Sequence, residues 1–243
     1  MPPISWWGWA CLGTLLLTLA APGASAASPQ RVLLIHSFGR DFAPYNHFSG
    51  VLRTELVSEA SGSVDVVEVS LDTARVADTA PEGPLVDYLA ALSASRPPDL
   101  VIPVGGPAVR FAQRHRQGLF PHTPLLIGGT DERHIQRATL TTNDAVVAGR
   151  IQLPRVAQTI LQVLPQTTNV VVVVGASPLE TFWLTEIRDA WQPFTNRVSL
   201  QPLNELAFAE MLKRCAALPP RSAIFYALMI MDVEGIPQWE EGA

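Results

Sequence analysis

The sequence contains little cysteine, which limits how the fold can be held together. Only Cys11 and Cys215 occur in 243 residues, and Cys11 lies in an N-terminal segment that has the character of an export signal. If that segment is removed, Cys215 has no partner for an internal disulfide, so the fold must depend on packing. The five histidines form no H-x-x-x-H or H-E-x-x-H pair, so we expect no metal site.

Positive charge is also scarce. Lysine and arginine number 17 against 22 aspartates and glutamates, and the net charge is −5. The densest basic stretch is "RFAQRHR" at 110 to 116, which is too small for a nucleic-acid-binding face. The glycine-containing stretches "GGPAVRFAQ" and "GGTDERH" match neither G-x-G-x-x-G nor G-x-x-x-x-G-K-[ST]. We therefore expect no nucleic-acid partner, no nucleotide and no cofactor.

The N-terminus has the features of a secretory signal. "WWGWACLGTLLLTLAAPGASA" is uncharged and apolar, and Ala24-Ser25-Ala26 supplies an A-x-A cleavage pattern. The apolar part, from about Trp6 to Ala21, is shorter than the roughly 20 residues of a membrane span. We predict cleavage after Ala26 and a periplasmic mature chain. An uncleaved membrane anchor is the alternative, because "MPPISWWGW" contains no lysine or arginine.

Short apolar runs then alternate with helical patterns. The predicted strands are "RVLLIHS" (31 to 37), "VDVVEVS" (64 to 70), "DLVIPVG" (99 to 105), "TPLLIGG" (123 to 129) and "AVVAGRI" (145 to 151). Each is apolar nearly throughout, which favours a parallel sheet covered on both faces. The segments between them carry apolar residues at three- and four-residue spacing, which is typical of amphipathic helices. The pattern predicts a doubly wound α/β lobe over residues 27 to 150.

The same alternation continues after residue 150. Helical patterns at 153 to 165, 178 to 194 and 207 to 218 separate predicted strands at 168 to 177, 197 to 203 and 222 to 230. Val170 to Val174 are five consecutive valines and predict a deeply buried central strand. We expect a second lobe at 151 to 243. It has only three strands, so we expect it to be incomplete and the chain to be truncated.

In open α/β sheets, ligands bind beyond the carboxyl ends of the strands. The residues at those ends predict a binding cleft between two lobes. Candidates for flat apolar contact are Phe38, Tyr45 and Phe48, and candidates for orienting a polar group are Arg40, Asp41 and Asp131. Ordinary βα turns need similar residues, and Tyr45 and Phe48 could simply pack the first helix.

A serine hydrolase is the alternative of another class. "VGASP" at 174 to 178 has the strand-serine-helix order of a nucleophile elbow, but Leu179 stands where G-x-S-x-G needs glycine. Ser177 is explained more simply as a helix N-cap, with Pro178 at the first position and Glu180 in a capping box. Ser37 follows His36 within a strand, so their side chains point to opposite faces and cannot pair.

Several phrases in order resemble a known family: "RVLLIHSFGRDFAPYNHFSGVLRTEL", "VEVSLDTAR", "PDLVIPVGGPAVRFAQRHRQGLFP", "NDAVVAGRI", "ILQVLPQTTNVVVVVGASPLETFW" and "LPPRSAIFYAL". They resemble the ABC-transporter substrate-binding-like family, which has the type I periplasmic-binding-protein fold. They are most similar to the version at the N-terminus of bacterial sensor histidine kinases.

The resemblance implies a non-catalytic, two-lobed receptor that closes on a small molecule. It would pass the closure to a kinase across the membrane or to an ABC permease. The family's ligand positions correspond to Ser37, Phe38, Gly105, Gly106, Asp131 and Ser177, and the residue patterns add Asp41 and Tyr45. Family members continue well beyond this chain's end, with further strands, a membrane span and a kinase, which fits the expected truncation.

Overall fold

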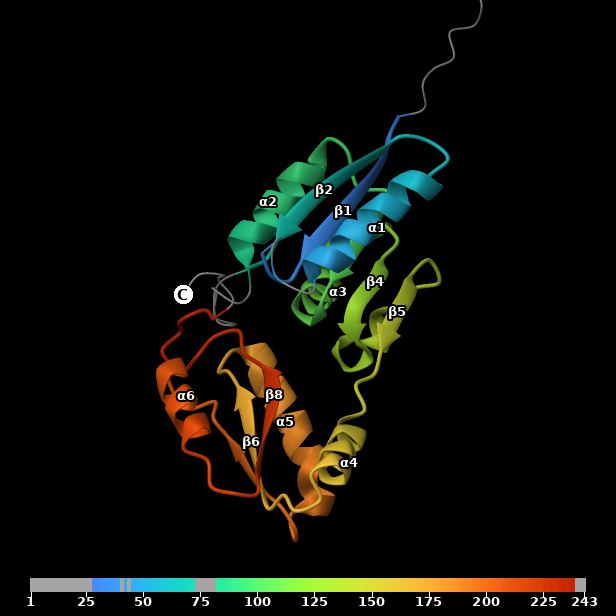
Figure 1. The fold of residues 1–243 in the computed structure, drawn as a ribbon. Helices are drawn as coiled ribbons and strands as arrows, with labels where there is room; N and C mark the ends of the chain where they lie inside the picture. The colour runs from blue at the N-terminus through green and yellow to red at the C-terminus, as the bar shows by residue number, and fades with distance from the viewer. Residues whose placement is uncertain (1–27, 40–41, 43–44, 73–81, 239–243) are drawn as a thin grey trace, which may run out of the picture.

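The protein consists of two α/β lobes, one above the other in the view of Figure 1. The computed structural model describes residues 28–39, 42, 45–72 and 82–238. The first lobe contains a five-stranded sheet with the order β2-β1-β3-β4-β5, in which all neighbours are parallel. Its strands are β1 (Gln30–His36), β2 (Val64–Ser70), β3 (Leu100–Val104), β4 (Leu126–Asp131) and β5 (Ala145–Gly149). The predicted strand order along the chain and the parallel sheet are confirmed.

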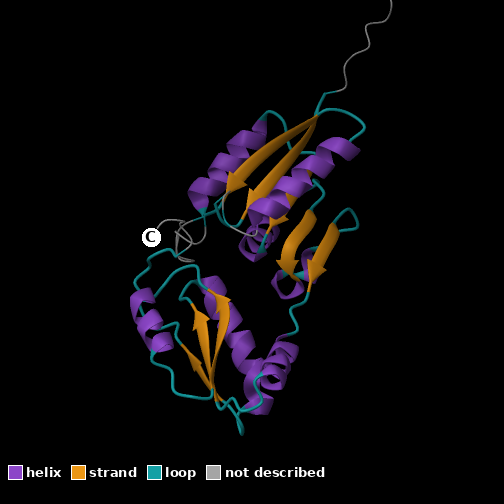
Figure 2. Ribbon diagram, viewed as in Figure 1, coloured by secondary structure: helices purple, strands orange, loops and turns teal. Residues whose placement is uncertain are grey.

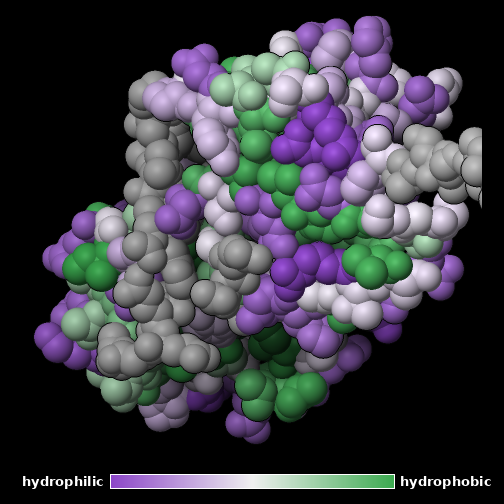
Figure 3. Space-filling view, turned by 90° about the horizontal axis from the view of Figure 1, so that it is seen from above, coloured by the Kyte–Doolittle hydropathy of each residue, from purple (hydrophilic) through white to green (hydrophobic). Residues whose placement is uncertain are grey.

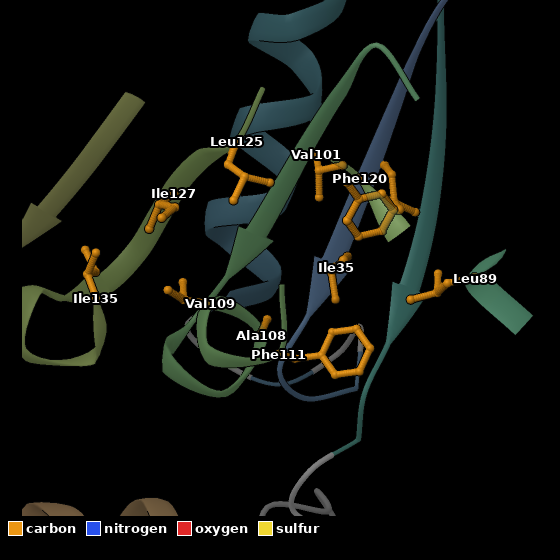
Figure 4. Close-up of a cluster of buried hydrophobic side chains, with 11 residues drawn as sticks. Ile35, Leu89, Val101, Ala108, Val109, Phe111, Phe120, Leu125, Ile127 and Ile135 are labelled. Carbon is orange, nitrogen blue, oxygen red and sulfur yellow. The ribbon is translucent and has the colours of Figure 1, made fainter. Parts of the chain in front are cut away.

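Helices cover both faces of this sheet. α1 (Tyr45–Glu59) packs through Leu52 and Leu56 on one face, against Leu34 and its neighbours. α2 (Gly83–Ala94) and α3 (Gly106–Leu119) cover the other face. Figure 4 shows this second core, in which Ile35 and Val101 of the sheet lie with Leu89 of α2 and Phe111 of α3. Alternate residues of β1 face the two helical layers, as the pleat of a strand requires.

One strand departs from the expectation of a sheet buried on both faces. All five residues of β5 are exposed, and Val147 retains 69% of its accessible surface. β5 is the edge strand and pairs only with β4. No helix among the described residues packs closely on it, so the strand is exposed although its residues are apolar.

The second lobe is built around a three-stranded parallel sheet with the order β7-β6-β8. Its elements are α4 (Leu153–Val163), β6 (Asn169–Val174), α5 (Pro178–Trp191), β7 (Ser199–Pro202), α6 (Phe208–Ala216) and β8 (Ser222–Leu228). β6 is the central strand, and Val170 to Val174 are all buried. Val170, Val172 and Val174 face the α4 and α5 side, whereas Val171 and Val173 face α6. The five valines therefore fill two core layers, as the sequence predicted.

The second lobe is incomplete as a doubly wound structure. β8 pairs with β6 on one side, and no strand in the described part of the chain pairs with its other edge. Ile224 and Tyr226 of β8 are 51% and 66% exposed. They alternate with Phe225, which packs on the α5 side, so the exposed face of β8 is the one that α6 leaves uncovered.

The two sheets point their carboxyl ends at each other. In Figure 2 the strand arrowheads of both lobes are directed toward the space between them. A short connection, residues 150 to 152, joins β5 to α4 and is the crossover between the lobes. The loops that follow β1, β3, β4, β6 and β8 are thereby brought to one region.

The outer surface is mixed in character. Figure 3 shows hydrophilic and hydrophobic residues interspersed on the face seen from above. Among the described residues, no helix is both long and apolar enough to cross a membrane.

Candidate functional site

A cleft of about 890 Å³ lies between the lobes. The first lobe and the connection contribute Phe38, Phe42, Tyr45, Gly106, Gly129, Thr130, Asp131, His134 and residues 147 to 151. The second lobe contributes Leu153, Val156, Leu179, Trp183, Ile187, Phe225, Ala227, Leu228 and Ile230. The walls are mainly apolar, and the volume falls in the range of about 300 to 1,000 Å³ that is usual for small-molecule sites.

A polar cluster joins the lobes beside the connection. We call it the hinge cluster: Asp131, Arg133, Ile151, Trp183 and Glu186. The Arg133 guanidinium donates to both Asp131 oxygens, Nε to Oδ1 at 2.8 Å and Nη2 to Oδ2 at 2.9 Å. It also donates to the Ile151 carbonyl at 3.0 Å and to the Glu186 carboxylate of α5. Its carbon Cζ lies 4.8 Å from the centre of the Trp183 ring. One side chain therefore contacts the first lobe, the connection and the second lobe.

The charges of the hinge cluster are strongly paired. Burial alone would raise the pKa of Asp131, but hydrogen bonds from the Arg133 side chain and from the backbone N–H groups of Arg133 and Ile151 lower it to about 2. Hydrogen bonding to Asp131 raises the pKa of Arg133 above its already high value. Both groups are ionised at neutral pH, and each provides the counter-charge and hydrogen-bond partners of the other.

His134 lies next to this cluster, in the short helix η1 (Glu132–His134). Its ring is 5% exposed and lies 4.4 Å from the Phe182 ring and edge-on to Trp183, centre to centre. Arg110 approaches Nδ1 to 2.9 Å. Burial, followed by repulsion from the Arg110 charge, lowers the pKa of His134 to about 4. The imidazole is neutral at pH 7 and forms part of the aromatic wall.

An apolar cluster joins the lobes elsewhere along the cleft. We call it the lip cluster: Phe38, Leu179 and Ile230, with Phe42 and Tyr45 packed against them. The Phe38 ring lies 4.5 Å from Phe42 and 5.7 Å from Tyr45, centre to centre. Phe38 is 3% exposed although it comes from the loop after β1, because Leu179 and Ile230 of the second lobe cover it.

Four of the residues proposed from the sequence line the cleft: Phe38, Tyr45, Gly106 and Asp131. Ser37 and Gly105 lie just behind the lining. Ser37 Oγ donates to the Val104 carbonyl at 2.7 Å and accepts from Ala108 N at 2.9 Å, which ties β1 to β3 and to the start of α3. Gly105 has φ +84°, and a Cβ there would lie 2.6 Å from Ser37 Oγ. Their role as direct ligand contacts stays a prediction.

Ser177 also lies behind the lining, at the start of α5. Its side chain accepts from Glu180 N at 3.4 Å, and the Glu180 carboxylate accepts from Ser177 N at 2.8 Å. This is the capping box that the sequence predicted. Glu180 also accepts from Gly175 N at 3.1 Å and from Ile230 N, so one buried carboxylate holds the ends of β6 and β8 to α5. A Cβ on Gly175 would lie 2.2 Å from a Glu180 oxygen, so this position needs glycine.

The other candidates are placed differently. Phe48 of α1 packs over Gly128 and Gly129 of β4 and does not line the cleft. This is the helix-packing alternative that the sequence left open. Arg40 and Asp41 lie outside the described residues.

A serine, a histidine and a carboxylate come together beneath α1, where the sequence suggested nothing. Ser49 Oγ lies 3.4 Å from His36 Nδ1, and His36 Nε2 lies 3.0 Å from Glu68 Oε2. The order resembles a catalytic triad. However, Ser49 and His36 are each 4% exposed and neither lines the cleft, so the hydroxyl is not accessible from the cleft. The array serves to pair polar groups between α1 and the sheet.

The sequence reasoning missed Arg133, Trp183 and Glu186. The last two lie three residues apart on α5, so they share a helix face with Leu179 and Ile187. That spacing is also typical of a helix whose face packs into the core of its own lobe. Only the position of the first lobe shows that Trp183 and Glu186 instead contact Arg133.

The fold places the protein in a recognisable structural class. The chain has a mixed α/β fold with parallel five- and three-stranded sheets, of the periplasmic-binding-protein type with an incomplete second lobe. It resembles a conserved domain protein of Vibrio cholerae, with TM-score 0.54 and 10% identity over 75% of this chain and 60% of that chain. It also resembles the ligand-free, open form of a substrate-binding protein with adhesive properties from Clostridium difficile, with TM-score 0.51 and 12% identity over 80% and 65% of the two chains.

A third similar structure is an ABC-transporter solute-binding protein from Clostridium phytofermentas with bound L-rhamnose. It has TM-score 0.48 and 14% identity over 86% of this chain and 63% of that chain. This chain therefore spans 60 to 65% of the length of the solved structures that it matches. The sequence matches no protein-family model and no curated protein.

Proposed function

We propose that this protein is an extracytoplasmic solute-binding protein that holds a small molecule in the cleft between its lobes and is not an enzyme. The observation that carries the proposal is the cleft of about 890 Å³, which lies where the carboxyl ends of both parallel sheets meet. This is the position at which open α/β sheets bind their ligands. The fold shared with a substrate-binding protein supports the same role.

Closure of the lobes would be the output of binding. A ligand that contacts both lobes stabilises the closed form only to the extent that it binds that form better than the open one. The connection at residues 150 to 152 would act as the hinge. Phe42 and Tyr45 from the first lobe and Trp183 and Phe225 from the second would contact the ligand from opposite sides.

The proposed domain division follows the sequence. Residues 1 to 26 would be a signal peptide that directs export to the periplasm, residues 27 to 150 the first lobe and residues 151 to 243 a partial second lobe. The resemblance to sensor-kinase input regions favours a role as the sensory input of a histidine kinase system. A receptor for an ABC importer is the alternative, and the two differ in the partner, a membrane-bound kinase or a permease.

A thermal-shift screen of the purified protein against amino acids, aromatic compounds, sugars and short peptides tests the binding function. A ligand that binds the native state selectively raises the melting temperature by mass action, and the shift grows with ligand concentration. We expect at least one compound to give such a saturable shift. If none of these classes does so, the binding function loses its support.

The hydrolase alternative makes a different prediction. Ser37 and Ser177 are each 2% exposed, and their hydroxyl groups are engaged in the contacts that hold β3, α3 and α5. A fluorophosphonate probe labels an activated serine stoichiometrically. We expect no labelling, and stoichiometric labelling at Ser37 or Ser177 would favour the hydrolase instead.

A further inference from the structure

We infer that the cleft takes an uncharged, largely apolar small molecule with a ring system, and not an amino acid, a carboxylate or a sugar. This inference rests on the proposed binding function and specifies its ligand class. Three features of the described residues carry it: the aromatic walls, the pairing of the charged groups, and the small number of backbone donors at the helix starts.

The walls offer ring faces and aliphatic groups from both lobes. Phe42 and Tyr45 lie on one side, and Trp183 and Phe225 on the other. Ring faces bind other rings through offset or edge contacts and by removing apolar surface from water. A ligand held between the lobes would therefore gain most from flat apolar surface on both of its sides.

The charged groups that could orient an ionic ligand are already paired within the protein. Of the described residues that line the cleft, only Asp131 and Arg150 carry a charge at neutral pH. Both Asp131 oxygens accept from Arg133, and Oδ2 also accepts from Ile151 N at 2.8 Å. Arg150 donates to Glu132 at 2.6 Å. An ammonium group entering the cleft would lose its water without gaining a free carboxylate from these residues, and a ligand carboxylate would have to compete with Glu132 for Arg150.

The helix starts that face the cleft offer few donors. A helix N-terminus binds an anion through N–H groups that lack other partners. At α3, Pro107 has no N–H and Ala108 N donates to Ser37 Oγ. At α5, Pro178 has no N–H and Glu180 N donates to Ser177 Oγ. Two of the first three positions in each helix therefore have no N–H to offer a ligand carboxylate.

His134 contributes an uncharged aromatic ring to the wall of the cleft. Its ring packs against Phe182 and Trp183, and Arg110 lies at Nδ1. The imidazole stays neutral in this setting and presents ring surface to the cleft. A sugar, which needs many directed hydrogen bonds, would leave several hydroxyl groups without partners here.

Matched pairs of compounds test the ligand class by isothermal titration calorimetry on the purified protein. Indole is compared with L-tryptophan and p-cresol with L-tyrosine, so each pair shares a ring and differs in the charged group. L-rhamnose serves as the polyol. We expect indole and p-cresol to bind at least tenfold more tightly than the matching amino acids, and L-rhamnose to show no saturable heat.

The outcomes separate the ligand class from the function itself. If either amino acid or L-rhamnose binds as tightly as the uncharged ring compounds, the ligand class is wrong while the binding function survives. If none of the five compounds binds, the class is overturned, and the broader screen then decides the function.

A pair of substitutions locates the bound ring. Val147→Asp places a carboxylate on the cleft wall at an exposed position of β5, and Val163→Asp makes the same change at an equally exposed position of α4 outside the lining. The two valines are 69% and 71% exposed, so neither change disturbs a core. We expect V147D to weaken indole binding at least fivefold and V163D to change it less than twofold. An unchanged affinity in V147D would place the ring outside the cleft and overturn the inference.

Discussion

Two of the contacts between the lobes, the hinge cluster and the lip cluster, are of opposite chemical kinds. The hinge cluster is made of charges and hydrogen bonds, in which Arg133 has defined partners at 2.8 to 3.0 Å. The lip cluster is made of apolar side chains, in which Phe38 is covered by Leu179 and Ile230. Directed bonds fix one geometry, whereas apolar contacts tolerate sliding and are lost only on separation. In the proposed closure, the hinge cluster would set the direction of lobe movement and the lip cluster would oppose its extent.

The largest effect should come from breaking the hinge cluster. Arg133→Ala leaves the nearly buried Asp131 carboxylate with backbone donors alone and removes the contact to Glu186. Removing one partner of a buried ion pair usually costs 3 to 5 kcal/mol, so we expect a loss of about 4 kcal/mol in the free energy of unfolding. Urea denaturation measures it. The control Arg137→Ala, whose side chain is 70% exposed, should cost less than about 0.5 kcal/mol.

Breaking the lip cluster should have a somewhat smaller effect that does not depend on salt. Phe38→Ala removes a ring that is 3% exposed, and large-to-small changes of this kind cost about 3 kcal/mol where a cavity already adjoins the site. Urea denaturation at low and high salt measures the loss, and Phe38→Leu should restore more than half of it. A loss that grows or shrinks with ionic strength would contradict the apolar assignment.

His134 should make the stability depend on pH. Unfolded His134 takes up a proton below its ordinary pKa of 6.5, whereas the folded residue stays neutral down to about 4. The unfolded state therefore binds more protons as the pH falls through this window, and the protein loses stability. Between pH 6.5 and 5 the loss should be about 1.6 kcal/mol, because the unfolded residue is only half protonated at pH 6.5 and the full 1.36 kcal/mol per pH unit applies only further below it.

The matched variants for this prediction are His134→Phe, which keeps a ring against Phe182 and Trp183, and His122→Gln at an exposed position. Urea denaturation at several pH values should show a weaker decline in the first and the full decline in the second. An identical pH profile in all three proteins would show that His134 is not the responsible group.

The smallest effect should come from the exposed end of the hinge cluster. Glu186→Gln removes the charge that Arg133 meets on α5, but the Glu186 side chain is 31% exposed and Arg133 keeps Asp131. Ion pairs near the surface contribute about 0.2 to 1 kcal/mol, so we expect a loss within that range that diminishes in high salt. Glu210→Gln, which affects an exposed pair on α6, is the control. A loss above about 2 kcal/mol would mean that Glu186, and not Asp131, is the main partner of Arg133.

The sequence predicted those features that depend on local patterns. Val170 to Val174 identified the central strand because an uninterrupted apolar run needs burial on both faces. The capping box at Ser177 was predictable because its atoms lie within three residues of each other. Phe38, Tyr45, Gly106 and Asp131 were found at the cleft because strand ends in a parallel sheet share one edge.

The rest depended on contacts between distant parts of the chain. The apolar sequence of β5 predicted a buried strand. In the structure β5 is exposed because it lies at the edge of the sheet. The sequence predicted Asp131 as a group that orients a ligand, which stays a prediction, but it could not show that both Asp131 oxygens accept from Arg133 and Ile151. The contact of Arg133 with Glu186, 53 residues away, requires the packing of one lobe on the other. Helical spacing alone cannot distinguish a helix face that contacts the other lobe from one that packs within its own lobe.

The Glu180 carboxylate has a mechanical consequence for the second lobe. It binds the backbone at the ends of both β6 and β8, so the first turn of α5 is clamped to the sheet with no flexible loop between them. Glu186 lies six residues further along the same helix, about 9 Å at the usual rise of 1.5 Å per residue. α5 is therefore held to the sheet of the second lobe near its start and to Arg133 of the first lobe at Glu186. If Arg133 moves and displaces Glu186, α5 would move together with β6 and β8, because Glu180 ties the start of the helix to both strands.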